Sequence, residues 1–359
     1  MTAFRAAIIG TGRIGSSYDD EVTHREPPDF YQGANRHAGL YTILPVNHAG
    51  AYLTTPGYAL VAAANRSEGK LRAFGERWGV EALYTDASRL FAQERPDVVS
   101  ICTQSAEKAE VTIAAAEAGV KAIVVEKAMA TSLAEADAMI AACERHGVLL
   151  VVNHPNRFSP MNRRAKALID AGEIGHLGTL IAHAGGGMLH VGTHTFDLMR
   201  YWAGDAVAIE AHVPDYRPAQ DLPATGTIRF ANGVTGFFDH THRARPGYEA
   251  RGATGSIHTS ASVGDGWLTR LAPMYPDSSR AYPTRVSYEP IDPPPHEVST
   301  TQRLFAELHE TLTTGAPFVS TGRDGAAALE LGIACFASHL AGGPVALPLA
   351  DRTPRVPNR

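Results

Sequence analysis

Residues 6–15 read AAIIGTGRIG, an apolar run that breaks into three glycines. The run is long enough for one buried strand, and Gly10, Gly12 and Gly15 have the G-x-G-x-x-G spacing of a dinucleotide-binding turn. In such a turn the first glycine permits a sharp bend, the second lets the backbone approach a pyrophosphate, and the third lets the next helix pack on the strand. The N-terminus of that helix favours the phosphates. The stretch predicts a dinucleotide site, with an ordinary strand–turn–helix link as the alternative.

The composition is typical of a globular protein with two domains. The chain has 359 residues, 44% hydrophobic and 19% charged, and a domain holds about 150 residues. The net charge of −5 gives no reason to expect nucleic acid or an anionic membrane as a partner. No apolar run approaches the length of about 18 residues that a membrane span needs, and the first residues lack a secretory layout. Cys102, Cys143 and Cys335 have no motif spacing, so we expect reduced cysteines in a cytoplasmic protein.

Short apolar runs alternate with helical patterns up to about residue 155. After the first strand, we expect strands at residues 58–65, 83–84, 98–103, 122–125 and 148–152. The helices expected between them include residues 71–79, 107–118 and 132–146. This alternation predicts the α/β class, with a doubly wound parallel sheet of the Rossmann type. Ligands of such a sheet bind at the carboxyl ends of the strands, which are at Gly10, Asn65, Thr103-Gln104, Glu126-Lys127 and Asn153-His154.

Two features of this first domain bear on the cofactor. Where an NAD site usually has an acidic residue at the end of the second strand, the chain has Asn65 and Arg66. An arginine there suits a 2′-phosphate, so the pattern favours NADP, with a merely exposed Arg66 as the alternative. Residues 17–46, rich in Pro, Tyr, His and Asp, are inserted after the glycine turn. Such an insertion predicts a lid, with a surface excursion as the alternative.

The pattern changes after about residue 155. We expect short strands at residues 178–184, 206–213, 226–230, 233–239, 256–260 and 284–288. Helices are expected at residues 160–171, 193–202, 301–314 and 325–340. The hairpin signal at Asn232-Gly233 favours antiparallel pairing. The sequence therefore predicts a dinucleotide-binding domain at 1–155 and a second domain at 156–359, with a mostly antiparallel sheet and a last helix that packs back.

Two stretches carry residue types suited to proton transfer. Lys127 ends a strand beside the expected crevice, where its ammonium can hold a substrate hydroxyl; a surface lysine is the alternative. In residues 185–197, GGGMLHVGTHTFD, the side chains of His190, His194 and Asp197 share one face if a helix begins there. A histidine on that face can relay a proton, with Asp197 fixing its tautomer. The alternatives are a zinc pair, although the glutamate of H-E-x-x-H is missing, and satisfied core histidines.

These stretches resemble, in this order, the glucose–fructose oxidoreductase, inositol dehydrogenase and MocA (Gfo/Idh/MocA) family. The resemblance is carried by residues 10–15, 98–103 with Ala109-Glu110, Glu126-Lys127, Arg157-Phe158, 185–197, 251–256, 315–317 and Gly325. It implies a Rossmann domain, a C-terminal α/β domain whose large open sheet packs in dimers or tetramers, and NAD(P)-linked oxidation or reduction of a sugar or cyclitol hydroxyl. It also implies that Lys127 and His194 are the catalytic lysine and histidine.

The chain departs from the family pattern at the site itself. The family's Glu-Lys-Pro, its Thr-Pro and a histidine a few residues later are replaced by Glu126-Lys127-Ala128, Thr103-Gln104 and Lys108. An Asp usually lies four residues before the catalytic histidine, and His190 stands there. A titratable group replaces an anion, which should change the pKa of Lys127.

We therefore expect an NAD(P)-dependent dehydrogenase or reductase for a sugar, sugar derivative or inositol, in which His194 is the base or acid, Lys127 polarises the reacting oxygen, and His190 and Asp197 tune that pair. The residues expected to bind the cofactor are Gly10, Gly12, Arg13, Ile14, Gly15, Asn65, Arg66, Thr103, Gln104, Lys108, Glu126 and Lys127. Those expected to line the substrate pocket are Asn153, Asn156, Arg157, His190 and His194. The alternatives are glycoside cleavage with a tightly held NAD, a non-catalytic NADPH-binding protein and a zinc hydrolase.

Overall fold

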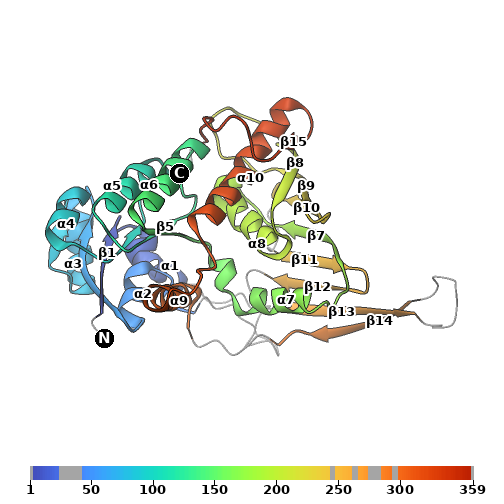
Figure 1. Cartoon of the computed structure of the whole chain (residues 1–359), viewed down its shortest axis with the longest axis horizontal. Coiled ribbons are helices and arrows are strands. Elements are labelled where there is room, and N and C mark those ends of the chain that lie inside the picture. The colour runs from blue at the N-terminus through green and yellow to red at the C-terminus, as the bar shows by residue number, and fades with distance from the viewer. Residues whose placement is uncertain are drawn as a thin grey trace.

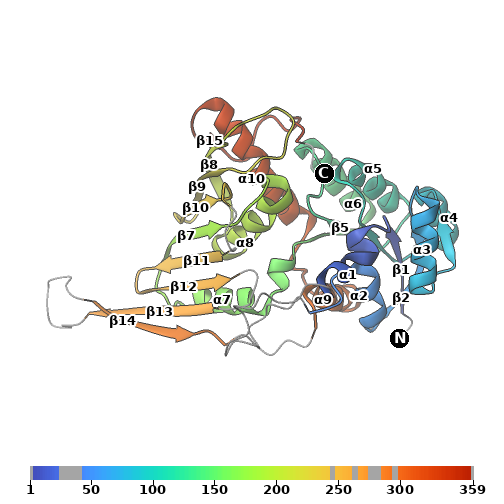
Figure 2. The same ribbon diagram turned by 180° about the vertical axis from the view of Figure 1, so that it is seen from behind.

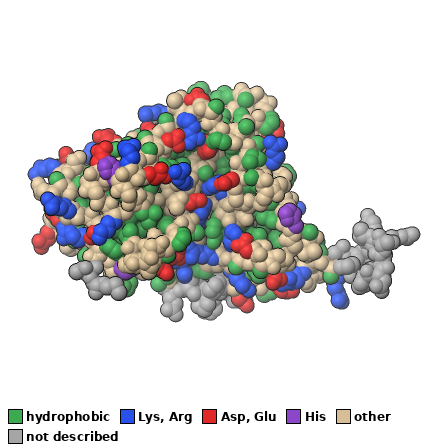
Figure 3. All heavy atoms as spheres, viewed as in Figure 1, with side chains coloured by type: hydrophobic (Ala, Val, Ile, Leu, Met, Phe, Trp, Pro, Cys, Tyr) green, Lys and Arg blue, Asp and Glu red, His purple; other side chains and the backbone are tan. Residues whose placement is uncertain are grey.

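The computed structural model of the protein describes residues 3–23, 43–242, 247–260, 266–273, 284–292 and 298–356. Most of the predicted lid at 17–46 lies outside the described residues. Two β-sheets lie side by side, with helices packed on them and between them (Figure 1). On the face drawn in Figure 3, Lys and Arg side chains are interspersed with Asp and Glu rather than gathered by sign. Among the described residues, no helix has the length and apolar character needed to cross a membrane.

The first sheet is the doubly wound sheet that the alternating pattern predicts. Its strands are β1(Phe4–Ile9), β2(Tyr58–Ala64), β3(Ala82–Tyr84), β4(Val98–Ile101), β5(Ala122–Glu126) and β6(Leu149–Asn153). They lie in the order β3-β2-β1-β4-β5-β6, and all neighbours are parallel. Helices cover both faces (Figures 1 and 2), which is why the central strands β4 and β5 are buried along their whole length. The predicted α/β class is confirmed.

The helices of this half are η1(Arg13–Ser17), α1(Tyr18–Thr23), α2(His48–Thr54), α3(Glu68–Trp78), α4(Ala87–Glu94), α5(Ser105–Glu117) and α6(Leu133–His146). Side-chain caps mark the start of four of them, namely α2, α3, α4 and α6. α6 has the capping box of Ser132 and Glu135 and ends at Gly147, whose φ of 67° is left-handed. α3 begins earlier than expected because the Ser67 side chain accepts a hydrogen bond from the N–H of Lys70.

The second sheet is large and mostly antiparallel, as predicted. Its strands are β7(Leu177–His183), β8(Ala206–His212), β9(Thr225–Phe230), β10(Thr235–Asp239), β11(Gly247–Gly252), β12(Gly255–Ser260), β13(Gly266–Pro273), β14(Thr284–Pro290) and β15(Val345–Ala346). They lie in the order β14-β13-β12-β11-β7-β10-β9-β8-β15, and only β7 and β10 pair in parallel. The expected strands do not include β11 and β13, whose sequences GYEARG and GWLTRLAP lack a clear apolar alternation.

Helices cover one face of the second sheet and leave the other open. They are η3(Pro155–Phe158), α7(Pro160–Asp170), η4(Met188–Gly192), α8(Thr193–Ala203) and α10(Gly322–Ala341). α8 and α10 lie between the two sheets (Figure 1), and α10 contacts β6 and α6 as well as β8 and α8. On β10, Phe238 is buried beneath the helices whereas its neighbour Phe237 is 45% exposed on the open face.

Helix α9(Thr300–Thr314) packs on the first half, although it follows the second sheet in the chain (Figures 1 and 2). Its Leu304, Phe305 and Leu308 are fully buried in one apolar cluster with Ile8 and Tyr52. α9 belongs to residues 156–359, whose assignment to one domain stays a prediction. The apolar face of α9 packs against α2 and η3 rather than against the second sheet.

Candidate active site

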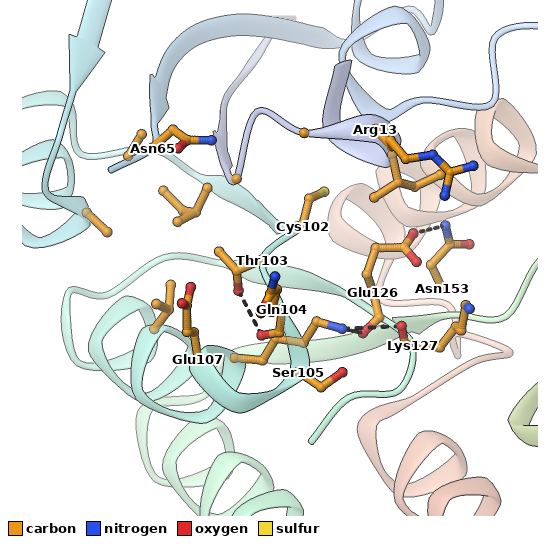
Figure 4. A pocket seen from close by; sticks show the side chains of 18 of the residues that line it. Arg13, Asn65, Cys102, Thr103, Gln104, Ser105, Glu107, Glu126, Lys127 and Asn153 are labelled. Carbon is orange, nitrogen blue, oxygen red and sulfur yellow. Dashed lines mark hydrogen bonds between the residues drawn. The ribbon is translucent and has the colours of Figure 1, made fainter. Parts of the chain in front are cut away.

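A cavity of about 1130 Å³ lies at the carboxyl ends of the strands of the first sheet (Figure 4). Its walls come from the glycine turn after β1, from the ends of β2, β4, β5 and β6, and from the η4–α8 segment of the second half. The predicted site residues that line it are Gly10, Gly12, Arg13, Ile14, Asn65, Arg66, Thr103, Gln104, Lys108, Glu126, Lys127, Asn153, His190 and His194. Four predicted residues lie outside the lining, namely Gly15, Asn156, Arg157 and Asp197.

The glycine turn has the geometry that a dinucleotide requires. Gly10 has a φ of +97°, and a Cβ there would lie 2.7 Å from the carbonyl carbon of Cys102. A Cβ at Gly15 would overlap the carbonyl oxygen of Gly10, so only glycine lets the helix approach the strand. At Gly12, in contrast, no atom lies within 4 Å of a built Cβ, which leaves the backbone open to the cavity. These residues fit the pyrophosphate of a dinucleotide.

The end of β2 supports this turn and presents two cations. Asn65 donates from Nδ2 to the hydroxyl of Thr11 at 2.9 Å. The side chain of Arg66 is 81% exposed and pairs with Glu107. Lys70 lines the same cavity. Figure 4 shows Asn65 and Glu107 at opposite sides of this end of the cavity.

Lys127 lies where the end of β5 faces η4. Its Nζ donates to the carbonyl oxygen of His190 at 2.8 Å. Burial lowers the pKa of Lys127, while the carboxylates of Glu126 and Asp221 act in the opposite direction. The charge of Lys127 in turn lowers the pKa of His190. A cation and a histidine are thus held next to each other inside the cavity.

The carboxylate of Glu126 joins β5 to β6 and α2. Its Oε1 accepts from Asn153 Nδ2 at 2.7 Å, as Figure 4 shows, and lies 3.0 Å from His48 Nε2. Burial alone would raise the pKa of Glu126, but the hydrogen bond and charge of His48 help to lower it to about 2. Burial alone would lower the pKa of His48, but Cys102 and Glu126 raise it to about 10. This buried ion pair was not predicted, because only the fold brings the two residues together.

His194 has the environment of a neutral base. Burial and the charge of Lys127 lower the pKa of His194 well below its ordinary value. Its Nδ1 is buried and has no hydrogen-bond partner among the described residues. A neutral imidazole beside an ammonium can accept the proton of a hydroxyl that the ammonium also binds.

Asp197 differs from its expected place beside His194. Its buried carboxylate accepts from Arg157 Nε at 2.8 Å and lies 3.3 Å from His154 Nδ1. The rings of His154 and His194 meet edge to face, with centroids 6.0 Å apart. Because the charged Arg157 attracts the carboxylate more strongly than a neutral imidazole does, Asp197 reaches His194 only through His154.

Arg157 and Asn156, which the sequence places in the substrate pocket, have their polar groups bound elsewhere. Arg157 has a side chain that is 5% exposed, and its Nη2 donates to Asp324 while it also pairs with Asp197. Asn156 donates from Nδ2 to Tyr248 Oη at 3.2 Å. A buried guanidinium needs these acceptors, so Arg157 ties η3 to α8 and α10 instead of facing the cavity.

Lys108 also differs from its expected role, because its ammonium turns toward the backbone. The residue lies on α5 and is 2% exposed. Its Nζ donates to the carbonyl oxygens of Glu126, Lys127 and Ala128 at 2.6, 3.2 and 2.8 Å. Burial lowers the pKa of Lys108 to about 8. The peptide bond between Lys127 and Ala128, where the resembled family has a proline, is cis.

Asp221 is a residue of this site that the sequence analysis did not identify. Its two carboxylate oxygens accept from the N–H groups of Leu189 and His190, each at 2.8 Å. A Cβ at Gly187 would overlap the carboxyl group of Asp221, so glycine is needed for this approach. Asp221 lies between β8 and β9 in a stretch without motif or periodicity, and no sequence signal marks it.

His190 and His194 have no third side chain beside them, in the described part of the chain, with which to hold a metal ion. Within the ranges that the structure describes, no group of three or more His, Cys, Asp or Glu side chains is arranged to hold a metal ion. His194 has Lys127 as a charged neighbour, and an ammonium repels a divalent cation.

Comparisons with known proteins match both halves of the chain. A family model described as an oxidoreductase family with an NAD-binding Rossmann fold matches residues 38–154, and the GFO/IDH/MocA C-terminal domain matches residues 179–267. D-apiose dehydrogenase of Paraburkholderia graminis is 30% identical over 243 residues, which cover 60% of this chain and 64% of that enzyme. Myo-inositol 2-dehydrogenase of Thermotoga maritima is 26% identical over 268 residues, covering 69% and 71%. The match to the apiose enzyme therefore spans less than two thirds of its length.

Solved structures share the fold over nearly the whole chain. A levoglucosan dehydrogenase in complex with NADH has a TM-score of 0.76 at 18% identity, covering 97% of this chain and 100% of that one. An oxidoreductase from Agrobacterium radiobacter, solved with NAD⁺, has a TM-score of 0.73 at 21% identity, covering 96% and 98%. The two family models together match more than half of the chain, in the same order as the two sheets. The chain therefore belongs to the GFO/IDH/MocA family of oxidoreductases, with an NAD-binding Rossmann domain.

Proposed function

We propose that the protein is an NAD(P)-dependent oxidoreductase that transfers a hydride between the nicotinamide and a hydroxyl or keto carbon of a sugar, sugar derivative or inositol. The observation that carries the proposal is that Lys127 and the neutral His194 line the cavity into which the open backbone of Gly12 faces. The names of two relatives, a D-apiose dehydrogenase and a myo-inositol 2-dehydrogenase, support the substrate class.

Lys127 and His194 have different roles at the reacting oxygen atom of the substrate. A bound nicotinamide dinucleotide supplies the site that accepts or donates the hydride. Lys127 uses one N–H on the carbonyl of His190 and has two more with which to bind the reacting oxygen and stabilise its negative charge. His194 takes the hydroxyl proton during oxidation and returns it during reduction. Asn153 Oδ1, which is buried and has no partner among the described residues, can accept from another substrate hydroxyl.

Replacement of Lys127 by alanine tests this proposal. With polyols and aldoses as substrates, we expect Lys127→Ala to lower kcat by about 100-fold or more, because it removes charge stabilisation that develops in the transition state. The dissociation constant of the reduced cofactor, measured by its fluorescence, should change by less than about threefold. Turnover is followed by the absorbance of the reduced nicotinamide.

The matched control is Lys166→Ala on α7, which removes a lysine paired with Asp170 in the same helix. It should leave kcat unchanged. Near-normal turnover in Lys127→Ala would refute the role of the lysine. Cleavage of a glycoside with no net change in the cofactor would replace the proposal by a redox-assisted elimination.

The finer cofactor preference that we propose is NADP over NAD. Arg66 and Lys70 both line the cavity at the end of β2, where no carboxylate from β2 is present to hold a ribose hydroxyl. The guanidinium of Arg66 is exposed and pairs with a side chain, Glu107, that a 2′-phosphate can displace.

We further propose that the protein acts on a small carbohydrate or polyol as a homo-dimer or homo-tetramer, joined through the open face of the second sheet. The exposed Phe237 and Trp267, 45% and 50% accessible, favour burial of that face against a second copy. The molar mass in solution, measured by light scattering, tests this; a monomer at micromolar concentration would refute it.

A further inference from the structure

We propose that Lys108 and Asp221 are positioning residues that fix Lys127 from two sides. Lys108 holds the backbone that carries Lys127, and Asp221 binds the N–H of His190, the residue whose carbonyl oxygen binds the Lys127 ammonium. The inference rests on the proposed function, because it assumes that Lys127 acts on the reacting oxygen. Neither residue needs to touch a ligand in this role.

The backbone around Lys127 is tied to α5 by the buried ammonium of Lys108 and by the hydroxyl of Ser105, which donates to the carbonyl oxygen of Ala128 at 3.0 Å. An ammonium has three N–H donors, and Lys108 directs them at the carbonyl oxygens of three successive residues, Glu126, Lys127 and Ala128. Glu126 is the last residue of β5 that pairs with β6, and Lys127 and Ala128 lie beyond that pairing. With all of its donors used, Lys108 has none left for a cofactor, although its side chain lines the cavity.

The side chain of Lys127 is fixed at its other end by the carbonyl group of His190, whose N–H is bound in turn by Asp221. The carbonyl oxygen of His190 accepts from Lys127 Nζ at 2.8 Å, and the N–H of the same residue donates to Asp221 Oδ2 at 2.8 Å. Asp221 Oδ1 accepts from the next N–H, that of Leu189, so the carboxylate binds the start of η4 in a two-pronged manner.

The backbone on both sides is shaped to admit this carboxylate. A side chain at Gly187 would overlap the carboxyl group of Asp221, whereas glycine leaves the space. The resembled family usually has its carboxylate at position 190, where this chain has histidine. In this chain the carboxylate of Asp221, from the loop between β8 and β9, binds the N–H of His190. Its negative charge therefore still acts on Lys127.

The charged groups around Lys127 make the two roles separable by pH. Glu126 and Asp221 favour the protonated form of Lys127 and Arg13 opposes it. Lys108 and His190 are further titratable neighbours. Removal of the Asp221 charge should therefore lower the pKa of Lys127, whereas removal of Lys108 takes away a like charge and should not.

The test measures kcat, KM and cofactor binding in Lys108→Met and Asp221→Asn. We expect each variant to lower kcat by about tenfold or more, with the dissociation constant of the reduced cofactor within about twofold of the unchanged protein. Asp221→Asn should also move the alkaline limb of kcat to lower pH. Asp239→Asn is the matched control, since it removes a carboxylate that binds the backbone N–H of Thr241 in another loop of the same sheet.

A background that lacks Lys127 decides whether both residues act through it. In Lys127→Ala, we expect Lys108→Met and Asp221→Asn to add less than about twofold to the loss of kcat. Full, independent losses in that background would overturn the proposal. Weaker cofactor binding with unchanged kcat in Lys108→Met would also overturn the proposal, because it would make Lys108 a cofactor ligand.

Folding and function are kept apart by two further measurements. Thermal unfolding shows whether each variant is folded. If Lys108→Met does not fold, Lys108→Gln, which keeps part of the donor set, replaces it. Unchanged kcat in the folded Lys108 variant and in Asp221→Asn overturns the proposal. Normal turnover in Lys127→Ala itself would instead refute the role of Lys127 in the proposed function, on which this inference rests. Loss in Lys127→Ala with no loss in the two positioning variants would refute only this inference.

Discussion

Lys127 and His194 share one cavity, yet their surroundings favour opposite protonation states. Lys127 is flanked by the carboxylates of Glu126 and Asp221, which favour its proton. Burial and the ammonium of Lys127 lower the pKa of His194, and the neighbouring His154 and His190 act in the same direction. A proton donor and a proton acceptor are therefore poised over the same small volume, which is the condition for acid–base work at one hydroxyl group.

Arg66 is where a single residue should decide between two cofactors. We expect Arg66→Ala to raise the dissociation constant of NADPH about tenfold, because hydrogen bonds to a charged phosphate contribute about 1.5–3 kcal/mol. The dissociation constant of NADH should change by less than about twofold. Both are measured by fluorescence titration. Arg72→Ala, which changes an exposed arginine of α3, is the control. Equal losses for both cofactors would assign Arg66 to the adenosine rather than to a 2′-phosphate.

At the scale of elements, the ends of α2, β5 and β6 are joined by buried polar groups. His48 at the start of α2 contacts the hydroxyl of Ser100 at 2.8 Å and Glu126 at 3.0 Å, and Asn153 at the end of β6 donates to the same carboxylate. These bonds hold the strand end that carries Lys127. An element that follows the insertion at 17–46 thereby helps to shape the cavity.

The His48–Glu126 pair predicts a pH dependence of stability. The pKa of His48 is raised to about 10 from about 6.5, so its contribution is complete below pH 6.5 and is lost as the pH rises toward 10. We expect His48→Gln to lower the free energy of unfolding by about 2 kcal/mol at pH 6. The difference from the unchanged protein should shrink at pH 8 and 10.

Urea unfolding at the three pH values measures this difference. His212→Gln, which replaces an exposed histidine of β8, is the control and should show no such trend. A constant difference between pH 6 and pH 10 would contradict the charged state of His48 in the folded protein.

At the scale of the whole molecule, two helices from the last part of the chain connect the two halves. α9 fills the apolar surface of the first half, and α10 lies between the sheets (Figure 2). The chain therefore passes from the first half to the second and back. The cavity, which takes walls from both halves, depends on this return because Thr300 and Thr301 at the start of α9 also line it.

The packing of α9 predicts a large cost for one substitution. Phe305 is fully buried and its ring lies 4.1 Å from that of Tyr52, centroid to centroid. We expect Phe305→Ala to lower the free energy of unfolding by about 3–5 kcal/mol, measured by urea denaturation. Leu340→Ala, at a position 65% exposed on α10, should change it by less than about 0.5 kcal/mol. Equal effects of the two variants would show that α9 is not part of the core.

The sequence by itself determined the elements that depend on local pattern. The strand–glycine–helix start, the alternation of strands and helices, and the antiparallel second sheet follow from periodicity and turn residues, which act over a few positions. Lys127 and His194, which line the cavity, each lie next to such a signal, a strand end and a glycine-rich stretch.

The tertiary structure decided what touches those residues. Asp221 and His48 carry no local signal, and their roles arise from contacts across long stretches of chain. Arg157 and Lys108 lie in predicted site segments, yet their charges turn to buried acceptors, because an unpaired charge in the interior costs more than a lost contact with a ligand. Pairing of charges is a long-range property of the fold, and a linear pattern of residue types does not contain it.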